Sequence, residues 1–241
     1  MILVWEENFD YEGAPNPEKW EAQVGGHGWG NNELQFYTAS GNAWVEGGRL
    51  IIEARKQDIE DKNITSARIR TKASWKYGRI EVRAKIPSGL GVWPAVWMMP
   101  VPISAKNKWP VCGEIDIMEH VAYMKNIVHA TVHTGAYNHM KKTQRGGTML
   151  VKNLTDDFHV YSVDWSEREM IFRVDGNIIF TYNPWEDGNN VTDAEWPFNK
   201  PFYLILNLAF GGNWGGARGV DMSALPARYE IDYVRVYQDQ Q

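Results

Sequence analysis

Three carboxylates lie within six residues of the chain, in the run Glu114-Ile115-Asp116-Ile117-Met118-Glu119. They alternate with apolar residues, and this pattern predicts a half-buried strand. In a regular strand Glu114 and Asp116 would share one face, whereas Glu119 would point into the core, where an unpaired carboxylate is costly. One extra residue near Met118, a β-bulge, would return Glu119 to the face of the other two, and bulges are common beside active sites. We therefore expect one strand face that bears three acids.

Two carboxylates on one face are suited to acid, base or nucleophilic chemistry at a single bond. With the bulge, the Cα atoms of Glu114 and Glu119 would be about 13 Å apart, at about 3.3 Å per strand residue. Side chains that lean together would bring the carboxyl groups to about 5 to 7 Å, which overlaps the about 5 to 5.5 Å of retaining glycosidases and reaches the about 6.5 to 9.5 Å of inverting ones. Asp116 lies between them, and its charge should raise the pKa of the neighbour that stays protonated.

An acidic, solvated strand face would show the same pattern. The chain holds a comparison in Glu230-Ile231-Asp232, which repeats the first three letters and continues without a third carboxylate. We interpret that second copy as structural. The surroundings of the first copy must therefore decide between chemistry and solvation.

The composition restricts the fold and the partners. With 241 residues and 44% apolar content, the chain is long enough to bury one sizeable core, and no linker divides it, so we expect one domain over residues 1–241. A net charge of −5 with dispersed Lys and Arg argues against a nucleic-acid partner. No apolar run approaches the roughly 18 residues of a membrane span, and the N-terminus lacks the pattern of a signal peptide. The single Cys112 excludes an internal disulfide and is expected to be a small buried side chain.

Short alternating segments predict an all-β fold. Turn signals separate about eleven such segments and helical periodicity is almost absent, which is typical of a two-sheet antiparallel β-sandwich. The most apolar segment, residues 201–210, should be a central strand. The twelve tryptophans and eleven tyrosines suit both a large core and a sugar-binding face, because pyranose rings stack on flat aromatic surfaces.

The acidic run resembles the signature of glycoside hydrolase family 16, in the form with one inserted residue that laminarinases (endo-β-1,3-glucanases) carry. Further segments resemble the family in the same order, and together they span nearly the whole chain. They are residues 28–35 (GWGNNELQ), 65–68 (TSAR), 77–81 (YGRIE), 93–98 (WPAVWM), 163–165 (VDW), 174–176 (VDG), 211–214 (GGNW) and 231–237 (IDYVRVY).

The resemblance implies a bent β-jelly roll, a concanavalin-like sandwich with an open substrate cleft on its concave sheet. It also implies retaining endo-hydrolysis of β-1,3-glucan of the laminarin type without a catalytic cofactor. Glu114 would be the nucleophile, Glu119 the acid and base, and Asp116 would tune the pair. Mixed-linkage β-1,3/1,4-glucan stays open as the substrate. We expect a monomer without membrane or nucleic-acid partners that is secreted, periplasmic or exposed at the cell surface, its signal peptide already removed.

Six positions are expected to contact the sugar: Asn32, Arg68, Trp93, Trp97, His133 and Asn207. Spacing puts Trp93 and Trp97 on one strand face, where two rings with Ala95 between them would form a slot, and core packing is the alternative. Arg68 shares a face with Arg70, so that a pair of exposed arginines is the alternative there. His133 and His129 would be about 13 Å apart, too far to share a metal. A loop over residues 101–112 should place Trp109 above the cleft.

The resemblance further implies one structural Ca²⁺ on the convex side of the fold. The matching positions lie near Asn8, Gly48 through its carbonyl group, and Asp232. Their oxygen ligands are of the type that calcium prefers.

Two other classes of function stay open at this point. A non-catalytic glucan-binding module is the first, because similar jelly rolls serve as lectins and recognition proteins. Those relatives typically lose one or both glutamates, whereas this chain keeps all three acids. A transglycosylase is the second, and it differs only in whether a sugar or water accepts the intermediate. The tryptophan and glycine segments follow the laminarinase form rather than that of enzymes acting on agarans or carrageenans.

Overall fold

The computed structural model describes residues 1–103, 107–186, 188 and 190–240. Almost all regular structure in these residues is β-strand. The strands are β1 (Ile2–Glu7), β2 (Trp20–Ala22), β3 (Phe36–Tyr37), β4 (Ala43–Glu46), β5 (Arg49–Ile59), β6 (Lys62–Ser66), β7 (Arg68–Thr71), β8 (Gly78–Lys85), β9 (Val92–Pro100), β10 (Glu114–Glu119), β11 (Ile127–His133), β12 (Arg145–Leu150), β13 (His159–Trp165), β14 (Met170–Val174), β15 (Asn177–Tyr182), β16 (Phe202–Phe210) and β17 (Ala227–Gln238).

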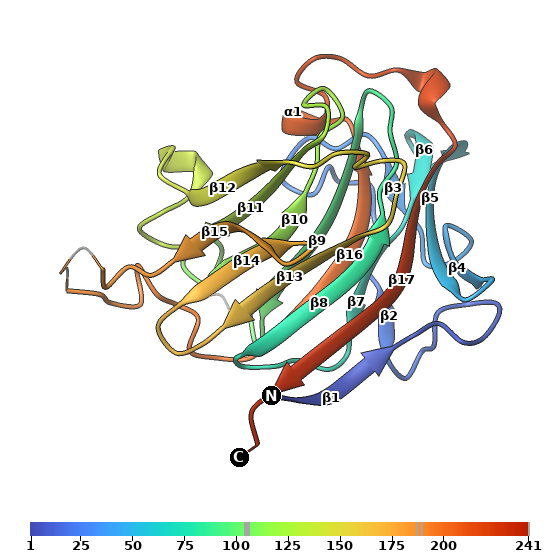
Figure 1. Cartoon of the computed structure of the whole chain (residues 1–241). Helices are drawn as coiled ribbons and strands as arrows, with labels where there is room; N and C mark the ends of the chain where they lie inside the picture. The colour runs from blue at the N-terminus through green and yellow to red at the C-terminus, as the bar shows by residue number, and fades with distance from the viewer. Residues whose placement is uncertain (104–106, 187, 189, 241) are drawn as a thin grey trace.

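The strands form two stacked, twisted sheets (Figure 1). In the described residues the larger sheet has ten strands, in the order β15-β14-β13-β8-β17-β5-β6-β3, with β1 paired to β17 and β4 paired to β5. The smaller sheet has seven, in the order β12-β11-β10-β9-β16-β7-β2. Neighbours are antiparallel apart from the parallel pair of β3 and β6. The predicted two-sheet sandwich is therefore confirmed.

The core fills the space between the sheets. In β8 the residues Ile80, Val82 and Ala84 are buried, and the charged residues between them are partly exposed. The strand β16, which the sequence places centrally, is buried along its whole length and lies between β9 and β7. Cys112 is fully buried, as expected for a small side chain.

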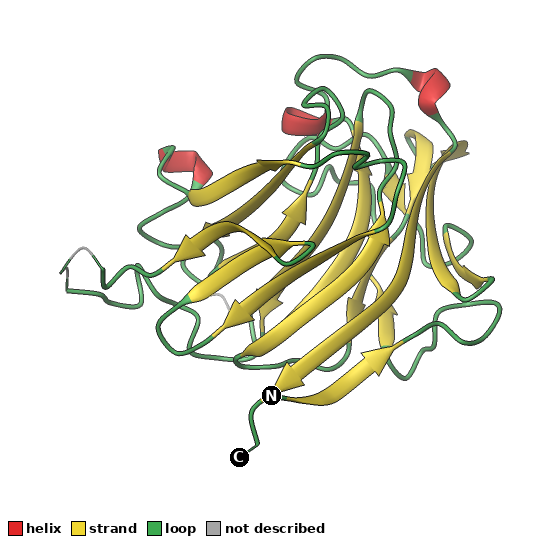
Figure 2. Ribbon diagram, viewed as in Figure 1, coloured by secondary structure: helices red, strands yellow, loops and turns green. Residues whose placement is uncertain are grey.

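Turns and short helical segments connect the strands (Figure 2). Asp175 and Gly176 join β14 to β15 with φ angles of 50° and 81°, and a type I′ hairpin turn requires positive φ at both positions. The helical segments of the described residues are α1 (Gly212–Gly215), η1 (His139–Lys141) and η2 (Met222–Ala224). The predicted loop over residues 101–112 contains no strand in its described part, nor does the segment 183–200, and residues 104–106, 187 and 189 lie outside the described residues.

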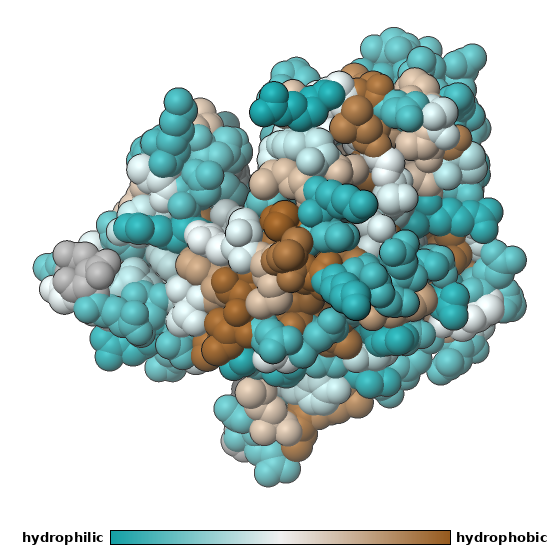
Figure 3. Space-filling model, turned by 45° about the horizontal axis from the view of Figure 1, so that its top comes forward, coloured by the Kyte–Doolittle hydropathy of each residue, from teal (hydrophilic) through white to brown (hydrophobic). Residues whose placement is uncertain are grey.

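The surface seen in Figure 3 is mainly hydrophilic, with an apolar patch near the middle of that face. The exposed large apolar side chains of the described residues include Ile2, Leu3 and Val4 on β1 and Ile178 on β15. Within the described ranges, no helix has the length and apolar character needed to cross a membrane.

Candidate active site

The register of β10 contains the bulge that the carboxylate spacing predicts. Three steps along β10, from Asp116 to Glu119, are matched by only two steps along β11. The register against β9 shifts between Asp116 and Met118. Ile117 and Met118 are consecutive buried residues, whereas Glu114 and Glu119 are partly exposed. All three carboxylates therefore lie on the face of the smaller sheet that points away from the core, which we call the outer face.

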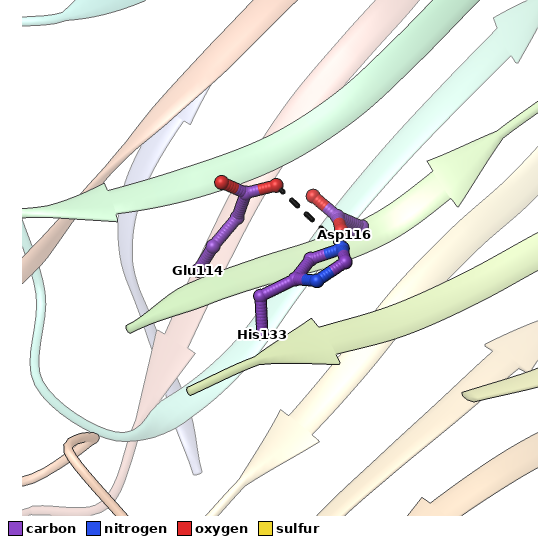
Figure 4. A group of neighbouring side chains, drawn as sticks. All are labelled: Glu114, Asp116 and His133. Carbon is purple, nitrogen blue, oxygen red and sulfur yellow. Dashed lines mark ion pairs between the residues drawn. The ribbon is translucent and has the colours of Figure 1, made fainter. Parts of the chain in front are cut away.

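Glu114 and Asp116 point from β10 toward His133 on β11 (Figure 4). Nε2 of His133 lies 3.3 Å from Oδ2 of Asp116 and 4.0 Å from Oε1 of Glu114. Ligand atoms of the three residues lie within 4.8 Å of one another, which is also the composition of a metal centre. A metal-bound His donates from its second nitrogen, but Nδ1 of His133 is buried without a hydrogen-bond partner among the described residues. The group is therefore better suited to acid and base chemistry.

An indole holds the carboxylate of Glu119. Nε1 of Trp93 donates a hydrogen bond of 3.0 Å to Oε1 of Glu119. The ring of Trp93 packs edge-on against Trp214, with centroids 5.5 Å apart, and Trp214 contacts His129, which is opposite Glu119 on β11. These contacts restrict the Glu119 side chain and leave Oε2 as the oxygen suited to carry a transferable proton.

Burial and mutual repulsion raise the pKa of all three carboxylates. Burial, and then the charge of Asp116, raise the pKa of Glu114 to about 8. Burial, and then the charge of Glu114, raise the pKa of Glu119 to about 7. Burial and the charge of Glu119 raise the pKa of Asp116 well above its ordinary value. The three groups titrate as a unit that retains protons at neutral pH. The neighbouring His133 lowers the pKa of Glu114 and so favours its ionised form.

Trp97 and Asn207 form a second group on the outer face. Nε1 of Trp97 donates a hydrogen bond of 2.7 Å to Oδ1 of Asn207. The guanidinium of Arg68 lies between two indoles, 4.4 Å from the ring centroid of Trp29 and 4.6 Å from that of Trp97. Burial lowers the pKa of Arg68, which is not the exposed arginine of the alternative interpretation. Because Arg68 covers one face of Trp97, only the other face and the edge of that indole remain for a sugar.

Asn32 is the predicted sugar contact that the structure links to another loop. Its backbone is left-handed, with φ of 54°, and its Nδ2 donates a hydrogen bond of 2.9 Å to Oδ1 of Asn213. This bond joins the turn that follows the glycine-rich loop of residues 25–30 to α1. In its described contacts Asn32 is thus bound to Asn213 rather than to the carboxylates, and its sugar contact stays a prediction.

Some residues of this face were missed by the sequence interpretation. Trp29 stacks on the arginine, and the glycines around it were the signal that could have found it. Tyr37 lies fully buried below the face.

Trp109, expected above the cleft, lies 5.9 Å from the ring of His133 and 4.9 Å from that of His139 on η1. The contact with His139 joins two loops that are separate in the sequence.

The comparison with known families agrees with this geometry. Residues 31–235 match the family model Glycosyl hydrolases family 16. The chain belongs to glycosyl hydrolase family 16. This confirms the resemblance seen in the sequence and makes the chain a glycoside hydrolase.

Relatives match this family 16 chain over almost its full length. The beta-glucanase of Rhodothermus marinus is 52% identical over 98% of this chain and 84% of that protein. Glucan endo-1,3-beta-glucosidase A1 of Niallia circulans is 38% identical over 100% of this chain, which spans only 38% of that longer protein. The solved laminarinase of Rhodothermus marinus has a TM-score of 0.96 at 50% identity, over 100% of this chain and 98% of that one. SCLam, a non-specific endo-beta-1,3(4)-glucanase, has a TM-score of 0.91 at 44% identity, over 99% and 91%.

The raised pKa values predict that this family 16 domain loses stability in alkaline solution. A carboxyl whose folded pKa exceeds its unfolded value stabilises the fold while it is protonated and loses that contribution as the pH rises through the folded pKa. With folded pKa values of about 8 for Glu114 and about 7 for Glu119, the loss extends from about pH 5 to about pH 9. Glu119→Gln should therefore unfold roughly 5 °C above the wild type at about pH 8.5 and at the same temperature at about pH 4.

Thermal unfolding followed by circular dichroism at both pH values measures this difference. A gain that is equal at acid and alkaline pH would contradict the electrostatic explanation, because packing changes do not depend on pH in this way.

The three predicted calcium residues belong to neighbouring segments of the larger sheet of this family 16 fold. Strands β1 and β5 pair with adjacent parts of β17, so Asn8 after β1 and Gly48 before β5 lie beside the segment that contains Asp232. Amide, carbonyl and carboxylate oxygens together suit Ca²⁺. Oδ2 of Asp232 accepts from Arg83 at 2.6 Å and Oδ1 of Asn8 accepts from Arg235 at 3.3 Å. The donor set fits the ion, and the two arginines would have to release these oxygens.

Proposed function

We propose that the chain is an endo-acting, retaining hydrolase of β-1,3-glucan of the laminarin type. The proposal rests on the bulge in β10, because with this bulge Glu114 and Glu119 lie on the same face of the sheet. Retaining glycosidases need two carboxyl groups that act on one glycosidic bond. The polymer is inferred from relatives named laminarinase and glucan endo-1,3-beta-glucosidase.

In the proposed reaction the Glu114 carboxylate attacks the anomeric carbon while the bond from that carbon to the leaving oxygen breaks. Glu119 gives its proton to the leaving oxygen, and a covalent glycosyl-enzyme remains. Glu119, now a carboxylate, takes a proton from the water that attacks the anomeric carbon and releases Glu114. His133 lies 3.3 Å from Oδ2 of Asp116 and keeps that carboxyl beside the nucleophile.

The proposed sugar contacts are the residues on and around the outer face. Trp97 and Trp93 would supply apolar surface beside the carboxylates, and the polar groups would bind hydroxyls. The set is Asn32, Arg68, Trp93, Trp97, His133 and Asn207.

Product analysis on three polymers tests the substrate. We expect laminarin to be cut early into oligosaccharides of several lengths, barley mixed-linkage glucan to be cut more slowly, and agarose to stay intact. A faster reaction on the mixed-linkage glucan would favour that alternative, and the relative SCLam is named a non-specific endo-beta-1,3(4)-glucanase. Cutting of agarose alone would contradict the proposal. Adding a labelled oligosaccharide acceptor to the laminarin reaction tells hydrolysis from transglycosylation, because only the latter yields labelled products longer than the acceptor.

We propose that the protein acts outside the cell, as a secreted, periplasmic or surface-exposed monomer, because a glucan polymer does not enter a cell. One core of buried side chains runs from Phe9 to Val236, which supports a single domain over residues 1–241. A single unfolding transition and a light-scattering mass of one chain are the expected observations.

We propose one structural Ca²⁺ held by Asn8, the carbonyl of Gly48 and Asp232, with no part in the chemistry. A ligand that binds only the folded state raises the unfolding temperature. Calcium at millimolar concentration should therefore raise the Tm of chelator-treated protein by roughly 3 °C or more, and Asp232→Asn should remove most of that rise. Magnesium at equal ionic strength is the control. A Tm that does not respond to calcium would contradict the site.

A further inference from the structure

Glu33 is a buried carboxylate that the proposed chemistry does not use. Only 5% of this residue is exposed, and burial raises its pKa. Its carboxylate accepts hydrogen bonds from three neutral side chains, Nε2 of Gln35 at 2.7 Å, the hydroxyl of Tyr37 at 3.2 Å and Nδ2 of Asn31 at 3.4 Å. A buried carboxylate is costly unless such donors satisfy it. An arrangement of this kind needs an explanation.

The hydroxyl of Tyr37 connects this carboxylate to Asn207 through hydrogen bonds. A hydroxyl has one proton, and because Tyr37 gives it to Glu33, its oxygen accepts from Nδ2 of Asn207 at 3.0 Å. With its NH₂ group on Tyr37, Asn207 turns Oδ1 toward Nε1 of Trp97 at 2.7 Å. All three hydrogen bonds in this row therefore donate toward Glu33. A charged acceptor at the end of the row strengthens every bond in it.

The far end of the row reaches the catalytic strand. Trp97 is opposite Asp116 in the pairing of β9 with β10. Its indole also packs on Arg68, which in turn stacks on Trp29. If Asn207 were reversed, its NH₂ group would face the indole N–H, and two donors cannot share a hydrogen bond. The indole would then have to move, and the arginine stacked on it would move too.

A second contact ties the same carboxylate to the loop that carries Trp214. Gln35, which donates to Glu33, uses its Oε1 to accept from the backbone N–H of Phe210 at 2.8 Å. A Cβ atom on Gly212 would lie 3.3 Å from Cγ of Glu33. Glu33 is thus fitted against the end of β16, at the start of the turn that contains α1.

We propose that Glu33 is a positioning residue whose carboxylate sets the direction of the row through Tyr37 and Asn207 and so holds the Trp97 indole in its sugar-binding orientation. This inference rests on the proposed function, in which Trp97 contacts the glucan. The row holds an indole that contacts both the intact substrate and the transition state, so its loss weakens binding of both. The effect therefore appears in KM more than in kcat.

The first test compares Glu33→Gln with Glu53→Gln. Glutamine keeps the shape of Glu33 but removes its charge. With its carbonyl oxygen in the place of Oε2, it leaves Tyr37 and Gln35 with a neutral acceptor, which weakens the row. Glu53 is a matched control, because it is 6% exposed, lies on the larger sheet and pairs with Arg228 at 2.8 Å. We expect Glu33→Gln to raise KM for laminari-oligosaccharides roughly tenfold with kcat nearly unchanged, and Glu53→Gln to lower Tm without changing KM.

The indole N–H resonance of Trp97, assigned with Trp97→Phe in ¹⁵N-labelled protein, gives a readout that needs no turnover. Glu33→Gln and Tyr37→Phe should each shift it. The double variant should change KM no more than the larger single change, because both substitutions break one row. If Glu33→Gln fails to fold, Tyr37→Phe provides the same test. An unchanged resonance and KM would overturn the inference, even with laminarin cut by the wild type. A shifted resonance in a protein that cuts no glucan would overturn the proposed function alone.

Discussion

Replacing Glu114 by Ala should lower kcat on laminarin roughly 10³-fold or more and leave oligosaccharide binding intact. Without this carboxylate no covalent bond to the anomeric carbon forms, and a 10³-fold loss corresponds to about 4 kcal/mol of transition-state stabilisation. The substitution also removes one of three mutually repelling acids, so the variant should be at least as stable as the wild type at alkaline pH. Initial rates of reducing-sugar release and calorimetric titration with laminaritetraose measure the two parts.

Glu230→Ala is the matched control for this experiment. Glu230 opens the second Glu-Ile-Asp run, lies in β17 of the larger sheet and pairs with Arg49 at 3.0 Å and Lys85 at 3.1 Å. Its loss should leave kcat unchanged and affect only stability. A wild-type protein that binds glucan without cutting it, and binds equally well after Glu114→Ala, would instead be the non-catalytic module.

Replacing Glu119 by Ala should lower kcat on laminarin by a similar factor, roughly 10³. The loss should be far smaller on a laminaribioside with a 2,4-dinitrophenyl leaving group. A sugar oxygen leaves only when it receives a proton, whereas the dinitrophenolate leaves without one, so the need for Glu119 in the first step disappears. The ratio of the two losses, taken from single-turnover rates, measures the role of Glu119 as the acid.

Trp93→Phe separates the acid from its partner. This variant keeps an aromatic ring but removes the 3.0 Å hydrogen bond to Oε1 of Glu119. It should shift the alkaline limb of the pH–rate profile to higher pH, because that bond favours the ionised form of Glu119.

For the Glu119→Ala variant, equal losses of kcat on laminarin and on the dinitrophenyl substrate would rule out proton donation by this residue.

The position of Glu119 could be predicted from the sequence because a regular strand would have buried a charge. Only an inserted residue resolves that conflict, and the register shift lies between Asp116 and Met118, where the spacing requires it. The hairpin at Asp175 and Gly176 could be predicted for a similar local reason, since few residues tolerate positive φ.

The partners of the predicted residues could not be found in the same way, because they come from distant parts of the chain. Tyr37 on β3 and Asn207 on β16 are 170 positions apart, and they meet only in the folded chain, where β3 pairs with β6 and β16 with β7. Alternation correctly put Trp97 on the face with the acids, but no local pattern indicates that Arg68 covers one side of its ring. Local spacing therefore predicts the face on which a side chain lies, and the tertiary fold decides what it contacts.

The anomeric configuration of the glycosyl azide formed by the two alanine variants tests the central claim most directly. Each variant is incubated with a dinitrophenyl β-laminaribioside and sodium azide, and the product is examined by ¹H NMR. If Glu114 is the nucleophile and Glu119 the acid and base, Glu114→Ala gives the α-azide, because azide enters the empty place of the nucleophile, and Glu119→Ala gives the β-azide from the glycosyl-enzyme. The opposite assignment, or the same anomer from both variants, would contradict the account.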